Sequence, residues 1–315
     1  MTPKVGWRWS RSSPKRIDAV KLDAYLTRRC QQVDRFLERC IPASHPDKLT
    51  QAMRYSLFSG GKRLRPILAL AACDAVEGEP ARVLPFASAI EIIHTYSLIH
   101  DDLPAMDDDA LRRGKATSHL VFGEALAILA GDGLLTEAFR IMAEAAAKPG
   151  IDPAHGLQVL AEVAKAAGAR GMVAGQAADI AAENVAADLP TVEWIHIRKT
   201  GALIRAAVRA GALLGGAQPD QLRRLTRYAD GIGLAFQIAD DILDAEASTA
   251  VTGKHTGRDQ ALHKATFPAL LGLSAAKERA HELLRNALRE LRPFRDRAEP
   301  LRAIARFVVG RACPV

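Results

Sequence analysis

Aromatic residues are scarce in this chain, since Phe, Trp and Tyr together make up 5 % of its 315 residues. Ala and Leu dominate the composition instead, which favours packed helices over sheets. Long hydrophobic runs are also missing, because no stretch reaches the roughly 20 uncharged residues that a membrane-spanning helix requires. We therefore expect a helical protein without stable membrane insertion.

Cysteine is rare, and no two cysteines form a CxxC pair; the four are Cys30, Cys40, Cys73 and Cys313. Their spacing indicates neither a zinc site nor a disulfide framework. It fits a reducing compartment, so we expect a cytoplasmic location.

The chain also lacks a basic tract interleaved with aromatic residues, although its net charge is +7. Lys and Arg follow helical patterns along the whole chain, which is typical of solvated helix faces. A small acidic substrate is the other interpretation of the positive charge. We expect no nucleic-acid partner.

The first 16 residues contain no acid and are rich in Ser and Arg. Transit peptides share this composition, and a disordered extension is the simpler interpretation. Hydrophobic residues then recur at helical spacing, without internal repeats, strand-like alternation or a separating linker, so we expect one all-helical domain over residues 17–315. The expected helices cover 17–41, 48–58, 67–76, 81–103, 118–147 with a break at 130–133, 153–167, 171–183, a helix opening at Pro190, 219–247, and others from about residue 264.

An acidic cluster ends the apolar, helix-compatible run that begins at His94. Crowded carboxylates repel one another, and burying any of them is costly without a partner. Mg²⁺ takes oxygen ligands and usually shares its shell with substrate phosphates. We therefore interpret the cluster as a Mg²⁺ site for a diphosphate; its members are Asp101, Asp102, Asp107, Asp108 and Asp109.

A second acidic cluster lies in the helix expected over 219–247. Asp240, Asp241 and Asp244 stand at i, i+1 and i+4, so we expect their carboxylates to share one face, joined by Gln237. Three acids on a largely apolar helix are out of place in an ordinary core. Two such clusters far apart in sequence point to metal binding more strongly than one.

Basic residues accompany both clusters. Gly60 and Gly61 allow close approach of the backbone, and three cations follow at Lys62, Arg63 and Arg65. This predicts an anion-binding turn at a helix start, with a simple helix break as the alternative. The spacing is not that of a Walker loop.

Other cations permit two interpretations. Arg112 and Arg113 follow the first acidic cluster, either as charge pairs or as bidentate phosphate clamps. Lys199 and Thr200 lie between apolar segments, and the pattern leaves their role open. Lys254 lies in a Gly-containing loop over 249–258 that suits a lid on an anionic ligand.

Together these features describe a metal–diphosphate site with two or more metal ions, in which positive charge stabilises a leaving diphosphate. The cations exceed what one diphosphate needs, so we expect two anionic substrates. The interior of a helical bundle would accept a hydrocarbon tail.

Five sequence blocks resemble the trans-isoprenyl diphosphate synthases, and in particular the bacterial farnesyl diphosphate synthases. They are GGKRLRP at 60–66, SLIHDDLPAMDDDALRRG at 97–114, GQ at 175–176, KTGALIRAA at 199–207 and DDILD at 240–244. The similarity covers about residues 50–275 and, more loosely, 17–312. After the second acidic block the chain departs from the family, which leaves the contacts of the 249–258 loop open.

The resemblance implies an isoprenoid-synthase-type helical bundle around a deep central pocket, a homodimer, and about two to three Mg²⁺ per active site. It also implies the reaction. Dimethylallyl or geranyl diphosphate ionises, the double bond of isopentenyl diphosphate attacks the carbocation, and a proton is lost.

The resemblance also assigns residues by position. The expected metal ligands are Asp101, Asp102, Asp107, Asp240, Asp241 and Asp244. The expected contacts to isopentenyl diphosphate are Lys62, Arg65, His94 and Arg113, and Gly61 is a further expected substrate-binding residue. The expected contacts to the allylic diphosphate are Arg112, Lys199, Thr200, Gln237 and Lys254. Catalysis itself is expected to depend on Lys199 and on all of these metal ligands except Asp244.

One assignment conflicts with ideal geometry. Asp108, rather than Asp107, would share a helix face with Asp101, because seven residues are close to two turns. Pro104 lacks an N–H group and should distort the helix at this point. We follow the family pattern and choose Asp107, with Asp108 as the alternative.

Product length is predicted from Tyr96, five residues and about 7.5 Å before Asp101 along a helix. An aromatic ring there, next to Ser97, would act as a floor for the growing tail. Relatives with an aromatic residue at this place make C15 products, so we expect (2E,6E)-farnesyl diphosphate. Geranylgeranyl diphosphate (C20) is the alternative, in which case Tyr96 is ordinary core packing.

Two other functions fit the sequence less well. A terpene cyclase would carry an Asn/Ser/Glu second motif and would not need GGKRLRP. A non-catalytic diphosphate-binding partner subunit would have lost residues of the acidic motifs, and none is missing here.

Overall fold

A computed structural model describes residues 16–43, 47–183, 187–249 and 265–313, and nearly all of this part is helical. The expected all-α class is confirmed. The elements are α1 (Arg16–Cys40), α2 (Lys48–Leu57), α3 (Leu64–Ala75), α4 (Pro80–Asp101), β1 (Leu111–Arg112), β2 (Lys115–Ala116), α5 (Ser118–Phe122), α6 (Glu124–Ala146), α7 (Pro153–Ala167), α8 (Met172–Ala181), α9 (Leu189–His196), η1 (Ile197–Gly201), α10 (Ala202–Leu214), α11 (Pro219–Thr249), α13 (Phe267–Leu271), α14 (Leu273–Glu290), η2 (Arg292–Ala298) and α15 (Glu299–Gly310).

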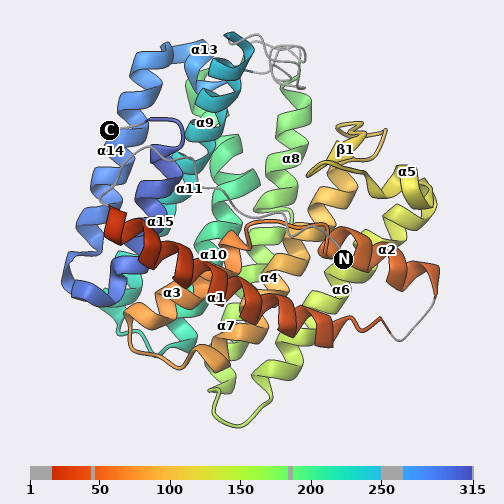
Figure 1. Ribbon diagram of the computed structural model, residues 1–315, viewed down its shortest axis with the longest axis horizontal. Helices are drawn as coiled ribbons and strands as arrows, with labels where there is room; N and C mark the ends of the chain where they lie inside the picture. The colour runs from red at the N-terminus through yellow and green to blue at the C-terminus, as the bar shows by residue number, and fades with distance from the viewer. Residues whose placement is uncertain (1–15, 44–46, 184–186, 250–264, 314–315) are drawn as a thin grey trace.

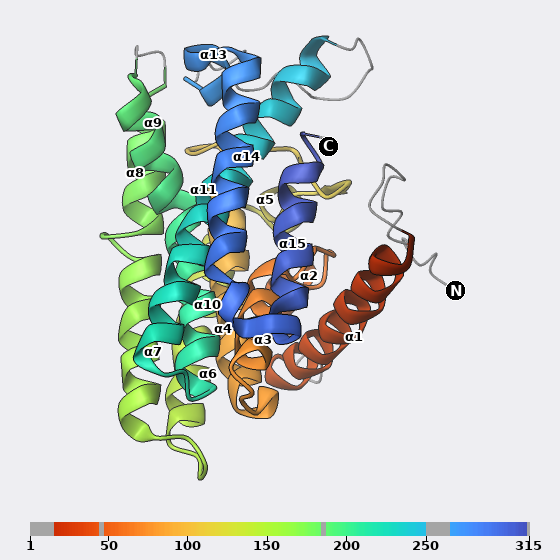
Figure 2. The ribbon, with the colours of Figure 1, turned by 90° about the vertical axis from the view of Figure 1, so that its left-hand side faces the viewer.

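Most of the long helices run roughly parallel to one another (Figure 2), while α1 crosses the outside of the bundle obliquely (Figures 1 and 2). Helix α4 packs on α6 and α3, α10 packs on α3 and α11, and α11 packs on α14. No helix in the described residues is long and apolar enough to cross a membrane. The predicted extension over residues 1–16 lies outside the described residues, apart from Arg16, which begins α1.

Local capping explains where several helices begin. The side chains of Asp47, Asp152 and Asp188 accept hydrogen bonds from backbone N–H groups in the first turns of α2, α7 and α9, at 2.7 to 3.0 Å. Thr266 caps α13 in the same way. Such caps satisfy N–H groups that have no partner within the helix.

The helix break expected at residues 130–133 is wrong. Helix α6 runs through that stretch, and the interruption lies earlier, at Gly123, whose φ of 85° ends α5. Gly131 has a packing role instead, because a Cβ atom there would collide with the imidazole of His100 on α4. The small residue allows close contact between two helices rather than marking a helix end.

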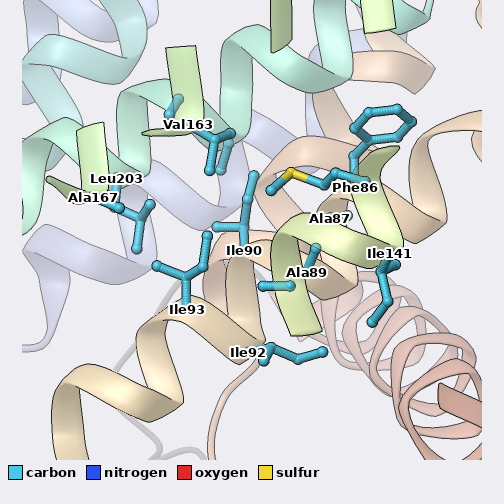
Figure 3. Close-up of a cluster of buried hydrophobic side chains, with 14 of the residues drawn as sticks. Phe86, Ala87, Ala89, Ile90, Ile92, Ile93, Ile141, Val163, Ala167 and Leu203 are labelled. Atoms are coloured by element: carbon cyan, nitrogen blue, oxygen red, sulfur yellow. The ribbon is translucent and has the colours of Figure 1, made fainter. Parts of the chain in front are cut away.

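The centre of the bundle is α4, which is buried on nearly all sides between residues 86 and 93. Figure 3 shows Phe86, Ile90 and Ile93 of this helix packed against Ile141, Val163, Ala167 and Leu203. Burying each large side chain of this kind contributes roughly 1.5–3 kcal/mol. Because α4 is packed on nearly all sides, its C-terminal end, where the first acidic cluster lies, has a fixed position.

Candidate active site

The first acidic cluster lies where α4 ends, at Asp101. The N–H group of Asp107 donates to the carbonyl of Asp101 at 2.8 Å, so the chain folds back immediately after the helix. Pro104 lies inside this fold and cannot extend a helical hydrogen-bond ladder. The expected distortion is confirmed, and ideal helix phase does not describe residues 101–109.

Of the two alternatives, Asp107 has a negative charge that acts on Asp101. Burial raises the pKa of Asp101 to about 6; Lys199 opposes this shift, and the negative charge of Asp107 adds to it. Asp108 is exposed and has a left-handed backbone, with φ of 49°. The interaction of Asp107 with Asp101 and the exposure of Asp108 thus favour Asp107 as the residue that would bind metal together with Asp101.

Arg112 is the counter-ion of the first acidic cluster. It is presented by the short β1–β2 hairpin, which turns at Arg113 and Gly114 through two positive φ angles. Its Nε–H donates to Asp102 Oδ1 at 2.9 Å, and its Nη2 donates to Asp109 Oδ2 at 2.9 Å. Burial raises the pKa of Asp102, and the bonds from Arg112 oppose that shift.

A cationic cluster, defined here as Arg65, Arg113 and His94, lies beside this hairpin. Burial lowers the pKa of the Arg65 guanidinium; Glu91 opposes the shift, Arg113 adds to it, and Asp240 opposes it. The buried Nε of Arg65 has no hydrogen-bond partner within the described residues. Burial and the neighbouring arginines lower the pKa of His94 well below its usual value, so its ring is neutral.

Gly61 is needed for the shape of this cluster. A Cβ atom at Gly61 would collide with the guanidinium of Arg113, which donates a hydrogen bond to the carbonyl of Gly60. Lys62, next in the chain, is exposed, and its ammonium lies 5.5 Å from the centre of the Phe307 ring. The expected turn therefore brings glycine backbone and cations together.

Arg63 departs from the expected anion-binding role. Its side chain is 3 % exposed and points into the bundle, where Nε–H donates to Asp34 at 2.9 Å and Nη1 donates to Glu91 at 3.2 Å. Its Nη2 donates to the carbonyl of Leu57, the last residue of α2, at 2.7 Å. Arg63 therefore stabilises the Gly60–Gly61 turn from the side that faces the interior of the bundle.

The second acidic cluster lies on α11. Asp240 accepts a hydrogen bond from Arg311 Nη2 at 3.0 Å, whereas Asp241 accepts from His196 and from the N–H of Phe267. Adjacent residues on a helix point about 100° apart. These two carboxylates therefore face different partners, contrary to the shared face expected from their spacing. Asp244 and Gln237 are half-buried on the same helix.

Arg311 is the cation that sequence reasoning missed. It follows α15, 71 residues after Asp240, and stacks over the Phe236 ring at 4.9 Å. Burial raises the pKa of Asp240, and Arg311 opposes that shift. Its position near the chain end carried no motif, so only the packing of α15 on α11 identifies it.

Lys199 is directed inward by a π-helical segment, η1. Its Nζ donates to Asp179 Oδ2 of α8 at 2.6 Å, and its charge opposes the raised pKa of Asp101. A Cβ atom at Gly175 would collide with the backbone of Lys199, so α8 and η1 approach closely there. π-Helical turns are often found at functional sites. Thr200, the next residue, is buried.

The sequence profile of polyprenyl synthetases matches residues 46–304. The chain belongs to the polyprenyl synthetase family.

Relatives and solved structures agree with this family. The chain is 49 % identical to the farnesyl diphosphate synthase of Geobacillus stearothermophilus over 93 % of its own length and 98 % of that protein. It is 46 % identical to the chloroplastic geranylgeranyl pyrophosphate synthase of Capsicum annuum, over 91 % and 78 % of the two chains. The apo crystal structure of an FPP/GFPP synthase from Zymomonas mobilis matches with a TM-score of 0.83 and 42 % identity, covering 92 % and 99 %.

This polyprenyl synthetase is therefore a prenyl-transferring enzyme of the trans-prenyl diphosphate synthase type. The relatives include both C15 and C20 synthases, so family membership alone leaves product length undecided. Lys254 lies outside the described residues, as does most of the loop expected over 249–258. The roles of the remaining site residues stay predictions.

Tyr96, the residue expected to limit product length, lies on α4 five residues before Asp101. Its side chain is 6 % exposed, and its ring meets that of His100 edge-on, with centroids 5.7 Å apart. Burial raises the pKa of Tyr96, and Asp101 adds to this shift. The neighbouring Ser97 donates its hydroxyl to the carbonyl of His94 at 2.9 Å.

The donor set suits Mg²⁺ shared with a diphosphate. Within the described residues no group of three His, Cys, Asp or Glu side chains is placed to hold a metal ion alone. Mg²⁺ commonly uses only one or two carboxylates, with water and substrate phosphates completing its shell. Burial raises the pKa of Asp101 and of Asp240, which means that it destabilises their ionised forms. A cation bound nearby would stabilise these ionised forms.

Proposed function

We propose that this prenyltransferase is a Mg²⁺-dependent (2E,6E)-farnesyl diphosphate synthase, which joins isopentenyl diphosphate head-to-tail to dimethylallyl or geranyl diphosphate. The observation that carries the proposal is that the cationic cluster interacts electrostatically with both acidic clusters: the charge of Asp240 acts on Arg65, and the charge of Asp102 acts on Arg113. Such a site accommodates two diphosphates and their metal ions.

The allylic diphosphate would lie at the first acidic cluster, with Arg112 and Lys199 beside its leaving oxygens and Thr200, Gln237 and Lys254 as further contacts. Isopentenyl diphosphate would lie against Lys62, Arg65 and Arg113. Neutral His94 can donate a hydrogen bond there without adding charge. The unpartnered Nε of Arg65 supports an anionic ligand at this place.

The carboxylates that would hold about two to three Mg²⁺ ions are those of both acidic clusters. From the first cluster they are Asp101, Asp102 and Asp107, and from α11 they are Asp240 and Asp244. Bound Mg²⁺ would neutralise the diphosphate oxygens and so favour breaking of the allylic C–O bond. Asp241, also expected as a ligand, has one oxygen engaged by His196 and Phe267.

Product length is assigned to Tyr96. A buried ring one to two turns behind Asp101 supports a floor that stops the tail at C15. If the product is C20, the Tyr96 ring does not block the growth of the tail beyond C15.

A homodimer and a cytoplasmic location complete the proposal. Leu120, Val121 and Leu129 are exposed apolar residues on neighbouring helices α5 and α6, and exposed apolar patches often mark protein interfaces. All four cysteines are free thiols, which supports a reducing compartment.

Incubation of the purified chain with geranyl diphosphate, labelled isopentenyl diphosphate and Mg²⁺ tests the function. We expect farnesyl diphosphate as the main product and none after chelation of the metal. A C20 main product would support the geranylgeranyl alternative, a cyclic hydrocarbon would support a terpene cyclase, and no turnover would support a partner subunit.

A further inference from the structure

We infer that Asp241 and His196 are positioning residues: the Asp241 carboxylate braces the start of α13 and the end of α9 against α11. This role goes beyond the metal-ligand role expected from the motif, and it rests on the proposed function for its effect on catalysis.

The brace is centred on one oxygen atom. Asp241 Oδ2 accepts a hydrogen bond from His196 Nε2 at 3.1 Å and another from the backbone N–H of Phe267 at 3.0 Å. Because a carboxylate oxygen accepts hydrogen bonds, we assign to His196 the tautomer that carries its proton on Nε2. Both donors come from elements other than the helix that carries Asp241.

The three residues of the brace are largely buried. The side chains of Asp241 and His196 are 7 % and 12 % exposed, and Phe267 is 1 % exposed. The His196 ring stacks on the Phe267 ring with centroids 5.6 Å apart and planes 19° apart. A buried carboxylate without donors would be costly, so these two bonds hold the three elements together strongly.

The brace also reaches the diphosphate contacts. His196 is the last residue of α9, and η1 begins at the next residue and carries Lys199. A Cβ atom at Gly233 of α11 would lie 2.9 Å from the Cα atom of Gly201, so η1 and α11 are in close contact. A displacement of His196 would therefore shift the backbone that positions Lys199, whose charge acts on Asp101.

The two roles of Asp241 make different predictions for substitutions. Asp241→Asn keeps a carbonyl oxygen that accepts both bonds, whereas Asp241→Ala removes the brace. His196→Ala removes one donor without touching any proposed metal ligand. His196→Gln keeps an N–H donor and serves as the conservative variant.

Hydrogen–deuterium exchange on the free protein measures the brace without substrate or metal. We expect the segment containing the Phe267 N–H to exchange at least tenfold faster in Asp241→Ala and in His196→Ala than in the wild type. Asp241→Asn and His196→Gln should stay within about threefold of the wild type. Asp240→Asn is the matched control and should leave this exchange unchanged.

Steady-state kinetics then separate positioning from metal binding. We expect His196→Ala to lower kcat at least tenfold while the Mg²⁺ concentration for half-maximal rate changes less than twofold, with partial recovery in His196→Gln. Wild-type exchange in both alanine variants would overturn the proposal. So would a tenfold higher Mg²⁺ requirement in Asp241→Asn. If the wild type made no prenyl diphosphate, the proposed function would fail while the exchange data would still decide on the brace.

Discussion

Arg63 and Glu91 form an ion pair inside the bundle, with Nη1 3.2 Å from Oε1 and side chains that are 3 % and 2 % exposed. The pair joins the Gly-Gly turn to the central helix α4, one turn before His94. Arg63 also has a left-handed backbone, with φ of 47°, which a non-glycine residue adopts only when its surroundings hold it. The shape of the proposed isopentenyl diphosphate site therefore depends on a cation that points into the bundle instead.

Breaking this pair should destabilise the protein. We expect Arg63→Met to lower the free energy of unfolding in urea by about 3–5 kcal/mol, because Glu91 is left buried without its partner. The double variant Arg63→Met/Glu91→Leu should be at least as stable as either single variant. Arg82→Met, which breaks an exposed pair with Glu79, is the control and should cost at most about 1 kcal/mol. Additive losses in the double variant would show that the two side chains are not coupled.

Shortening Tyr96 should lengthen the product. Tyr96→Ala removes a buried ring behind Asp101 and leaves room for a further isoprene unit, so we expect C20 to replace C15 as the main product. Tyr96→Phe keeps the ring and should still make C15. Chromatography of dephosphorylated products distinguishes the two, and an unchanged C15 product in Tyr96→Ala would assign Tyr96 to core packing alone.

Asp107 and Asp108 should differ in importance although they are neighbours. Asp107→Asn removes a charge that acts on Asp101, and we expect kcat to fall about 100-fold, as for loss of one electrostatic group at an active site. Asp108→Asn changes an exposed side chain and should stay within about threefold of the wild type. The reverse order would assign the metal-binding role to Asp108 instead of Asp107.

The Glu162–Arg209 pair should make stability depend on pH in a known direction. Burial alone would raise the pKa of Glu162, but hydrogen bonds from Arg209 and Gln158 outweigh it and lower the pKa. A lowered folded-state pKa means that the carboxylate stabilises the fold above its unfolded pKa of about 4.3 and that this contribution is lost as pH falls through the folded value.

We therefore expect Glu162→Gln to cost about 1.5–3 kcal/mol at pH 7 and progressively less below pH ~4. Urea unfolding at both pH values measures this difference. Glu144→Gln provides the control, since that side chain is 61 % exposed in its pair with Arg140. A pH-independent loss in Glu162→Gln would mean that the charge of the pair does not stabilise the fold.

Sequence patterns predicted most helices to within a few residues of their observed bounds, because their ends depend on local signals. Pro190 and Asp152 with Pro153 act within one turn of the helix start that they influence. The predicted helix break at Gly131 was wrong, because a glycine is needed there for close contact with His100 on another helix. The β1–β2 hairpin and the π-helical turn at Lys199 had no local signature in the pattern.

By itself the sequence determined the helical class, the two acidic clusters, the basic turn and the family, since these are properties of residues close together along the chain. The tertiary structure alone decided which partner each charge takes. Arg63 turns inward to Glu91, Arg311 reaches Asp240 from the chain end, and Asp241 holds Phe267 rather than sharing the face of Asp240. The interaction energy of two charges falls with their distance and depends on how deeply they are buried. Both the distance and the burial are set by the packing of helices that are far apart in sequence.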